Sequence, residues 1–248
     1  MTYKTHIQQY LEKHGCEALR PKAVLFDMDG VLYDSMPRHA EAWQRSMACF
    51  GITMNEMDAY LTEGARGVDT IRKMVRQQQG REIDETEAQR MYDKKTEFFH
   101  AMTEAPIMAG IPELMRQIDA CGMQVGVVTG SGQRPLINRL MKDFGQYLTE
   151  DHITTAYDVK RGKPAPDPYL MGLEKMGSLK PWQAIVVENA PLGVAAGVAA
   201  RIFTIAVNTG ILAADCLQEQ GADMIFNDMP TLSREWNEMM DAMSLRRA

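Results

Sequence analysis

Short, nearly continuous apolar runs recur along the chain and predict buried β-strands. These runs occupy residues 22–26, 124–129, 184–188 and 202–207, with a weaker one at 223–226. Runs without polar alternation are typical of strands that are buried on both faces of a parallel sheet. Helical patterns separate them, at residues 111–122, 133–145, 166–177, 191–200 and 211–221. This alternation predicts an α/β fold with a doubly wound parallel-sheet core.

The alternation breaks between residues 36 and 105, where successive segments carry helical patterns and no convincing strand occurs. These segments are 37–51, 55–64, 68–80 and 85–102. We therefore expect an all-α helical cap domain at 36–105, inserted into an α/β core formed by 1–35 and 106–248. Its hinges are expected where proline and small residues gather, in YDSMP and EAPIMAG. Residues 1–20 are expected to add an N-terminal helix.

Length and composition are those of a globular protein and exclude several partners. The 248 residues carry a net charge of −6 and no basic run, so neither nucleic acid nor a membrane surface is an expected partner. No apolar run reaches the roughly 20 residues of a membrane helix, and the N-terminus lacks a signal-like centre, so we expect a cytoplasmic monomer. The four cysteines form no CxxC pair, which predicts reduced and mostly buried thiols.

Two aspartates at the end of the first predicted strand require an explanation. Asp27 and Asp29 are two positions apart, so an extended chain directs both side chains to the same side. Carboxylates this close repel each other and cost desolvation free energy, which a metal ion or a catalytic role must offset. EF-hand loops also contain Asp-x-Asp-Gly, but they need an oxygen side chain and a glutamate where Val31 and His39 stand.

Further polar residues are expected at the same edge of the sheet, because ligands of open α/β sheets bind outside the carboxyl ends of the strands. They follow later strands or precede the next helix: Thr129, Gly130, Ser131, Lys163, Glu188 and Asn189. Magnesium prefers oxygen ligands, and a carboxylate can attack phosphorus while a second carboxyl moves the proton. A hydroxyl and a lysine can hold phosphoryl oxygens. The set therefore suits phosphoryl transfer.

The motifs DMDGVL, TGS, GKPAPDPYL and VVENAPLGVAAGVAA resemble, in order, the four motifs of the haloacid dehalogenase-like superfamily. The similarity extends over almost the whole chain after residue 20. The helical insertion is similar to the small cap of the β-phosphoglucomutase-like branch. This resemblance implies a Rossmann-like core, Mg²⁺ as the cofactor and a small phosphorylated compound or pyrophosphate as the substrate.

The resemblance also implies a role for each core residue. Asp27 is implied as the nucleophile and a magnesium ligand, and Asp29 as the general acid/base that also binds the metal through its backbone oxygen. Thr129, with the amides of Gly130 and Ser131, is implied to hold the phosphoryl group.

Lys163 is implied to neutralise charge on the nucleophile and the phosphoryl group, and Glu188 and Asn189 are implied to lie at the metal. Relatives usually have two acidic residues at this last pair of positions, so the metal site is one negative charge short. The asparagine can still offer its carbonyl oxygen. We hypothesise that Glu63, in the cap segment LTEGARGVDT, supplies a carboxylate when the cap closes.

Two further cap residues are candidates for substrate binding. The resemblance places His39, on the first cap helix, facing the site, although a lone histidine is more often structural. Arg66 lies close to Glu63 in the segment that matches the family's substrate-specificity loop, which favours an anion contact over a solvated charge.

Chemistry other than phosphate transfer is disfavoured. Dehalogenation needs no acid at the position of Asp29. A reaction that releases an oxygen leaving group needs such an acid to protonate that oxygen. Phosphonate cleavage needs a Schiff-base lysine, and the cap lysines Lys73, Lys94 and Lys95 lie outside the specificity-loop segment.

Within phosphate chemistry we favour hydrolysis of pyrophosphate or a small phosphate ester through an aspartyl-phosphate, because the chain resembles a pyrophosphatase-like member of the branch. The alternative is a β-phosphoglucomutase. Its relatives carry a Ser-Arg pair in the specificity loop, where this chain has GARGVD. A catalytically idle ligand-binding protein is the remote alternative, against which the complete set of catalytic residue types argues.

Overall fold

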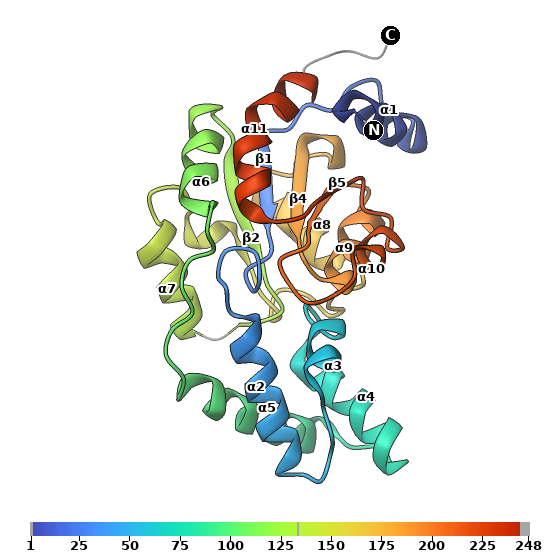
Figure 1. The fold of residues 1–248 in the computed structure, drawn as a ribbon, viewed down its shortest axis with the longest axis vertical. Helices are drawn as coiled ribbons and strands as arrows, with labels where there is room; N and C mark the ends of the chain where they lie inside the picture. Colours follow the sequence, from blue (N-terminus) through green and yellow to red (C-terminus); the bar gives the residue numbers. More distant parts are fainter. Residues whose placement is uncertain (1, 133, 244–248) are drawn as a thin grey trace.

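The computed structural model describes residues 2–132 and 134–243, with an α/β core at one end and a helical cap at the other (Figure 1). The strands of this part of the chain are β1 (Ala23–Phe26), β2 (Gln124–Val128), β3 (Ile153–Thr154), β4 (Ala184–Glu188), β5 (Phe203–Val207) and β6 (Met224–Phe226). They form one parallel sheet with the order β3-β2-β1-β4-β5-β6. The predicted fold class is confirmed.

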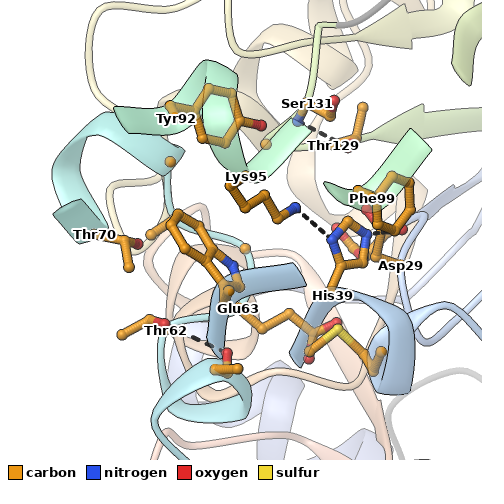
Figure 2. A pocket seen from close by; sticks show the side chains of 18 of the residues that line it. Asp29, His39, Thr62, Glu63, Thr70, Tyr92, Lys95, Phe99, Thr129 and Ser131 are labelled. Carbon is orange, nitrogen blue, oxygen red and sulfur yellow. Dashed lines mark hydrogen bonds and ion pairs between the residues drawn. The ribbon is translucent and has the colours of Figure 1, made fainter. Parts of the chain in front are cut away.

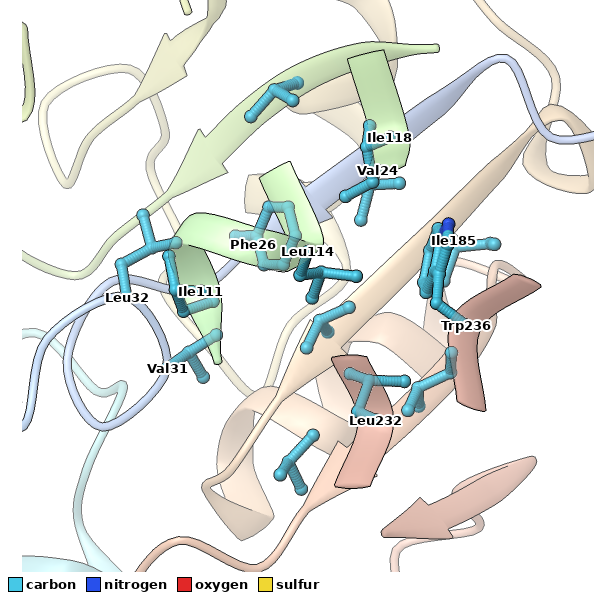
Figure 3. Close-up of a cluster of buried hydrophobic side chains, with 14 of the residues drawn as sticks. Val24, Phe26, Val31, Leu32, Ile111, Leu114, Ile118, Ile185, Leu232 and Trp236 are labelled. Carbon is cyan, nitrogen blue, oxygen red and sulfur yellow. The ribbon is translucent and has the colours of Figure 1, made fainter. Parts of the chain in front are cut away.

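Helices cover both faces of the sheet. They are α1 (Tyr3–His14), α6 (Ile111–Ala120), α7 (Arg134–Phe144), α8 (Asp167–Lys175), α9 (Pro191–Ala199), α10 (Ala214–Gln218) and α11 (Met229–Met243), with single 3₁₀ turns at Glu150–His152 and Pro181–Gln183. Alternate side chains of β1 point to opposite faces, as strand geometry requires. Val24 and Phe26 join a cluster with α1, α6, α7 and α11, whereas Leu25 packs with α8. Figure 3 shows the first cluster, with Leu114 of α6 and Trp236 of α11.

Three core elements differ from the sequence-based expectation. The strand β3 and the helix α11 were not predicted. The helix expected at 211–221 is shorter, because the chain before α10 turns toward the cap and buries Leu212 in the apolar cluster of the cap. Position 133, the expected start of another helix, lies outside the described residues.

The cap contains the helices α2 (Met36–Ala48), α3 (Glu56–Leu61), α4 (Gly67–Gln79) and α5 (Glu85–His100). Their inward faces form an apolar cluster separate from those of the core, with Trp43, Met47 and Ile71 among its members. The helix α3 begins at a capping box, in which Asn55 and Asp58 exchange hydrogen bonds. A helical cap is therefore present, and the division at residues 36 and 105 stays a prediction.

The cap is closed onto the core. The two connecting segments run side by side, with Asp34 N donating to Pro106 O at 3.0 Å and Met108 N to Leu32 O at 2.9 Å. The cap loop before α4 reaches the core at Gly130, where an added Cβ would lie only 2.9 Å from Gly64 O. A side chain at position 130 would therefore push the cap away.

The cysteines were expected to be mostly buried, and this expectation is wrong. All four are free thiols, but Cys49 and Cys121 are exposed, and Cys16 and Cys216 are half-buried. The two exposed thiols stand at the C-terminal ends of α2 and α6, where the chain leaves a helix at the surface. Across residues 2–132 and 134–243, no helix has the length and apolar character needed to cross a membrane.

Candidate active site

The register of the sheet brings the predicted motif residues to one edge. Phe26 at the end of β1 pairs with Val127 of β2 and Val187 of β4, so these three strands end at the same level. Asp27, the next residue, donates its backbone N–H to Val187 O at 3.0 Å. The carboxyl ends of these strands face the cap, and a cavity lies between core and cap there.

Lys163 is the centre of a buried charge cluster under this cavity. Its Nζ donates to Asp27 Oδ1 at 2.5 Å, to Glu188 Oε1 at 2.7 Å and to Val128 O at 3.0 Å. Burial raises the pKa of Asp27, although Lys163 opposes that shift. Burial also acts to lower the pKa of Lys163, but the attraction of Asp27 and Glu188 prevails and raises it. The lysine therefore stays charged and compensates two buried carboxylates.

Glu188 holds this lysine in place. Its Oε1 also accepts from Tyr169 OH at 2.7 Å, and its Oε2 accepts from the backbone amides of Asn189 and Ala190 at 3.1 and 3.3 Å. Protein donors thus occupy both carboxylate oxygens, and Glu188 is absent from the lining of the cavity. In this closed geometry Glu188 positions Lys163, and its role at the metal stays a prediction.

Asn189 meets the cap carboxylate of Glu63. Its Nδ2 donates to Glu63 Oε1 at 3.1 Å and to Oε2 at 3.2 Å. The contact lies against Gly30, whose φ of +80° favours glycine and whose added Cβ would lie 2.1 Å from Asn189 Nδ2. Burial raises the pKa of Glu63 well above its usual value, and the nearby Asp27 raises it further. The structure therefore brings Glu63 to the edge of the sheet that carries the core motifs.

Two buried oxygens in this region have no protein partner. Among the described residues, Asn189 Oδ1 and Ser131 Oγ belong to a small set of buried side-chain atoms without a hydrogen bond. An orphaned amide oxygen beside carboxylates fits a magnesium site, because magnesium takes oxygen ligands. No three acidic, histidine or thiol groups of the described residues converge on one metal position, so such a site needs amide, backbone or substrate oxygens as well.

The loop after β2 presents polar groups to the cavity, and its role in holding a phosphoryl group stays a prediction. Thr129 N donates to Thr154 O at 2.9 Å, which ties the loop to β3, and Ser131 N donates to Thr129 Oγ1 at 3.0 Å. Thr129, Gly130 and Ser131 all line the cavity. The orphaned Ser131 hydroxyl adds a donor for an anion at this position.

Asp29 lies at the end of a hydrogen-bonded chain from the cap (Figure 2). Its Oδ1 accepts from Ser35 Oγ at 2.6 Å and from His39 Nε2 at 2.9 Å, and Lys95 Nζ lies 2.6 Å from His39 Nδ1. The lysine can only donate, so His39 accepts at Nδ1 and carries its proton on Nε2. Phe99 stacks on the imidazole with the ring centroids 4.1 Å apart.

Electrostatics in this chain favour an ionised Asp29. Burial alone would raise the pKa of Asp29, but His39 and Ser35 overcome this effect and lower it to about 2. Burial also lowers the pKa of Lys95 to about 8, against the attraction of Asp29. The sequence had indicated His39, but it marked Lys95 only as one of three cap lysines and did not indicate Ser35. Spacing along a helix does not reveal which lysine faces the core.

The cavity is small and partly aromatic. It has a volume of about 70 Å³, and the cap contributes Trp43, Tyr92 and Phe99 to its wall. The closed cavity therefore suits a compact ligand.

Arg66 is the one predicted site residue that the structure places elsewhere. Its guanidinium forms a bidentate pair with Asp69, at 2.7 and 3.0 Å, and it lines a different cavity beside Gly162. In this closed state Arg66 does not line the main cavity, and its anion contact stays a prediction.

Sequence and structure comparisons place this chain among phosphatases and phosphomutases with the same α/β fold. The family model of haloacid dehalogenase-like hydrolases matches residues 21–201. Hexitol phosphatase A of Escherichia coli is 34% identical over 192 residues, which cover 77% of this chain and 84% of the relative. A β-phosphoglucomutase of Mycobacterium bovis is 28% identical over 249 residues, covering 85% and 91% of the two chains. A solved Bacteroides vulgatus protein, provisionally assigned as a β-phosphoglucomutase, is 45% identical with a TM-score of 0.94 over 98% of each chain.

Proposed function

This chain belongs to the haloacid dehalogenase-like hydrolases, and we propose that within this family it is a magnesium-dependent phosphohydrolase of pyrophosphate or a similarly compact phosphate ester. The observation that carries the proposal is the contact between the cap carboxylate of Glu63 and Asn189. In its ionised form, which a bound cation would favour, Glu63 adds a negative charge at the place where the core lacks one, at the wall of a cavity of about 70 Å³.

The residues that would hold magnesium are Asp27, the backbone oxygen of Asp29, Asn189 through its orphaned Oδ1, and Glu63 from the cap. When bound, the ion supplies positive charge that shields the phosphoryl oxygens from the attacking carboxylate. A pyrophosphate anion brings more negative charge to the site than a sugar phosphate does. A closed site with an additional carboxylate for the cation suits such a substrate.

The remaining steps follow from the side chains of the chain itself. Asp27 attacks phosphorus and forms an aspartyl-phosphate. Asp29, which its contacts with His39 and Ser35 favour in the ionised form, must first take up a proton, which it then gives to the leaving oxygen. Asp29 then takes a proton from the water that attacks the aspartyl-phosphate, which regenerates Asp27. Lys163 beside Asp27 compensates charge on the nucleophile, and Ser131 with Thr129 donates to the phosphoryl oxygens.

Hydrolysis of a polyol phosphate is the second candidate. The relative that supports it is the Escherichia coli hexitol phosphatase, at 34% identity. The mutase alternative is supported by the Bacteroides vulgatus structure, at 45% identity. Either substrate class carries a leaving group larger than phosphate, and we therefore expect it to need a more open cap than the one observed.

Removal of the cap carboxylate tests the proposal. We expect Glu63→Ala to raise the magnesium concentration for half-maximal pyrophosphate hydrolysis by on the order of tenfold, because a charged ligand of the cation is lost. Glu63→Gln should weaken magnesium dependence in the same direction, since it keeps the shape and removes the charge. Glu97→Ala, on the exposed side of α5, is the matched control and should leave the titration unchanged. A wild-type magnesium titration for Glu63→Ala would refute the role of Glu63.

Removal of the imidazole tests the positioning of Asp29. We expect His39→Ala to lower kcat by on the order of 100-fold, because proton transfer by a correctly held carboxyl contributes about this much. KM should change far less, since His39 acts on the substrate through Asp29. Lys95→Met should lower kcat in the same direction by a smaller factor. An unchanged kcat with a raised KM would show instead that His39 only binds substrate.

A further inference from the structure

A second cavity lies at the junction of cap and core, and we name it the seam cavity. Its volume is about 390 Å³, and its cationic lining residues are Arg66 and Lys73 from the cap with Lys160, Arg161 and Lys163 from the core. The ammonium of Lys163 is engaged with Asp27 and Glu188, so it does not contribute a free charge here. Of the four other cations, Lys73, Lys160 and Arg161 are exposed and Arg66 is half-buried, so they line an open cavity with contributions from both cap and core.

The charge of this lining is only partly compensated. Arg66 pairs with Asp69, and Arg161 pairs with Asp167 at 3.0 and 2.9 Å. In the ranges 2–132 and 134–243, no carboxylate lies within ion-pair distance of Lys73 or Lys160.

The seam cavity therefore concentrates positive charge on a chain whose net charge is −6. Cations that face each other across a cleft attract anions and raise their local concentration.

The seam cavity is separate from the catalytic cavity. The two share only Thr62, Ala65 and Thr70, so the short cap segment at these residues divides them. The stem of Arg66 closes one side of the seam, because an added Cβ on Gly162 would lie 2.8 Å from Arg66 Cγ. Arg66, which the sequence assigned to the substrate, thus belongs to this second cavity.

We propose that the seam cavity binds one phosphate-type dianion between Lys73 of the cap and Lys160 of the core. Two lysine ammonium groups with no carboxylate partner can each form a charge-assisted hydrogen bond with such an anion, and the guanidinium groups of Arg66 and Arg161 retain outward N–H donors. The anion offsets the repulsion between the cations of the two domains. This site is independent of the identity of the catalytic substrate.

Isothermal titration with inorganic phosphate in the presence of magnesium tests the site. The seam variant is Lys73→Gln/Lys160→Gln. The control is Lys4→Gln/Lys22→Gln, which removes the same charge from two exposed lysines of the core. We expect wild type and the control each to bind one phosphate per chain at the seam cavity. In the seam variant, the affinity for this phosphate should fall at least about tenfold, so that one bound phosphate fewer is detected.

The comparison isolates the seam cavity whatever the catalytic cavity binds, because only the difference between variants is used. Phosphate held by Thr129 and Ser131 contributes equally to all three proteins and also shows that each is folded. Equal phosphate stoichiometry and affinity in wild type and the seam variant would overturn the inference. An equal loss in the control variant would overturn it too, because it would show that net charge and not this cavity holds the anion.

Discussion

Asp27→Asn is expected to reduce phosphate release by on the order of 10⁴-fold or more, because the variant keeps the shape of the side chain and removes the nucleophile. The loss should appear with every phosphate substrate, since each passes through the same aspartyl-phosphate. Steady-state release of phosphate with saturating magnesium is the measurement.

Asp34→Asn is the matched control for this substitution, because Asp34 is exposed on the segment that connects core and cap. Its activity should stay within about twofold of wild type, as expected for a surface change that removes no contact with the substrate. Substantial turnover by Asp27→Asn would exclude a covalent mechanism at this residue. It would leave only direct attack by water on the bound phosphate.

Lys163→Met is expected to be the most destabilising single change in the site. The variant leaves the carboxylates of Asp27 and Glu188 buried without their cation, and breaking a buried pair in this way costs about 3–5 kcal/mol. Denaturant unfolding should be measured in the presence of a chelator, because magnesium would partly replace the lost charge. Activity should be lost in parallel.

Lys94→Met provides the comparison for stability, since Lys94 forms an exposed ion pair with Glu97 on α5. Its unfolding free energy should change by no more than about 0.5 kcal/mol, as is usual for surface pairs. Equal unfolding free energies for the two variants would contradict the account of the buried cluster.

The fold could be predicted where a strand or helix is long enough to produce a recognisable pattern of apolar and polar residues in the sequence. The strands β1, β2, β4 and β5 are continuous apolar runs, so their burial on both faces was readable from the chain. The strand β3 has only two residues, too few for any pattern. The helix at 211–221 was overestimated because Leu212 fits a helical pattern but packs into the cap, which is a tertiary effect.

In the site, likewise, residues in local sequence motifs could be predicted, whereas residues that join the site through tertiary contacts could not. Motif residues at strand ends could be placed together because parallel strands end at one edge of the sheet. Ser35, Lys95 and Tyr169 were not predicted as site residues, because their roles depend on hydrogen bonds to distant residues. The ion pair of Arg66 with Asp69 was not predicted either, because sequence proximity to Glu63 does not reveal the direction of a side chain.

The most direct test of the proposed function compares kcat/KM for the hydrolysis of pyrophosphate, a hexitol phosphate and β-glucose 1-phosphate in the presence of magnesium. Isomerisation of β-glucose 1-phosphate is assayed in parallel, with glucose 1,6-bisphosphate added. The account predicts that pyrophosphate is hydrolysed with the highest kcat/KM, by about tenfold or more over either ester, because the closed cavity discriminates by size and charge. Isomerisation of glucose 1-phosphate that depends on the bisphosphate and exceeds all hydrolysis would contradict it, and would identify the chain as a mutase.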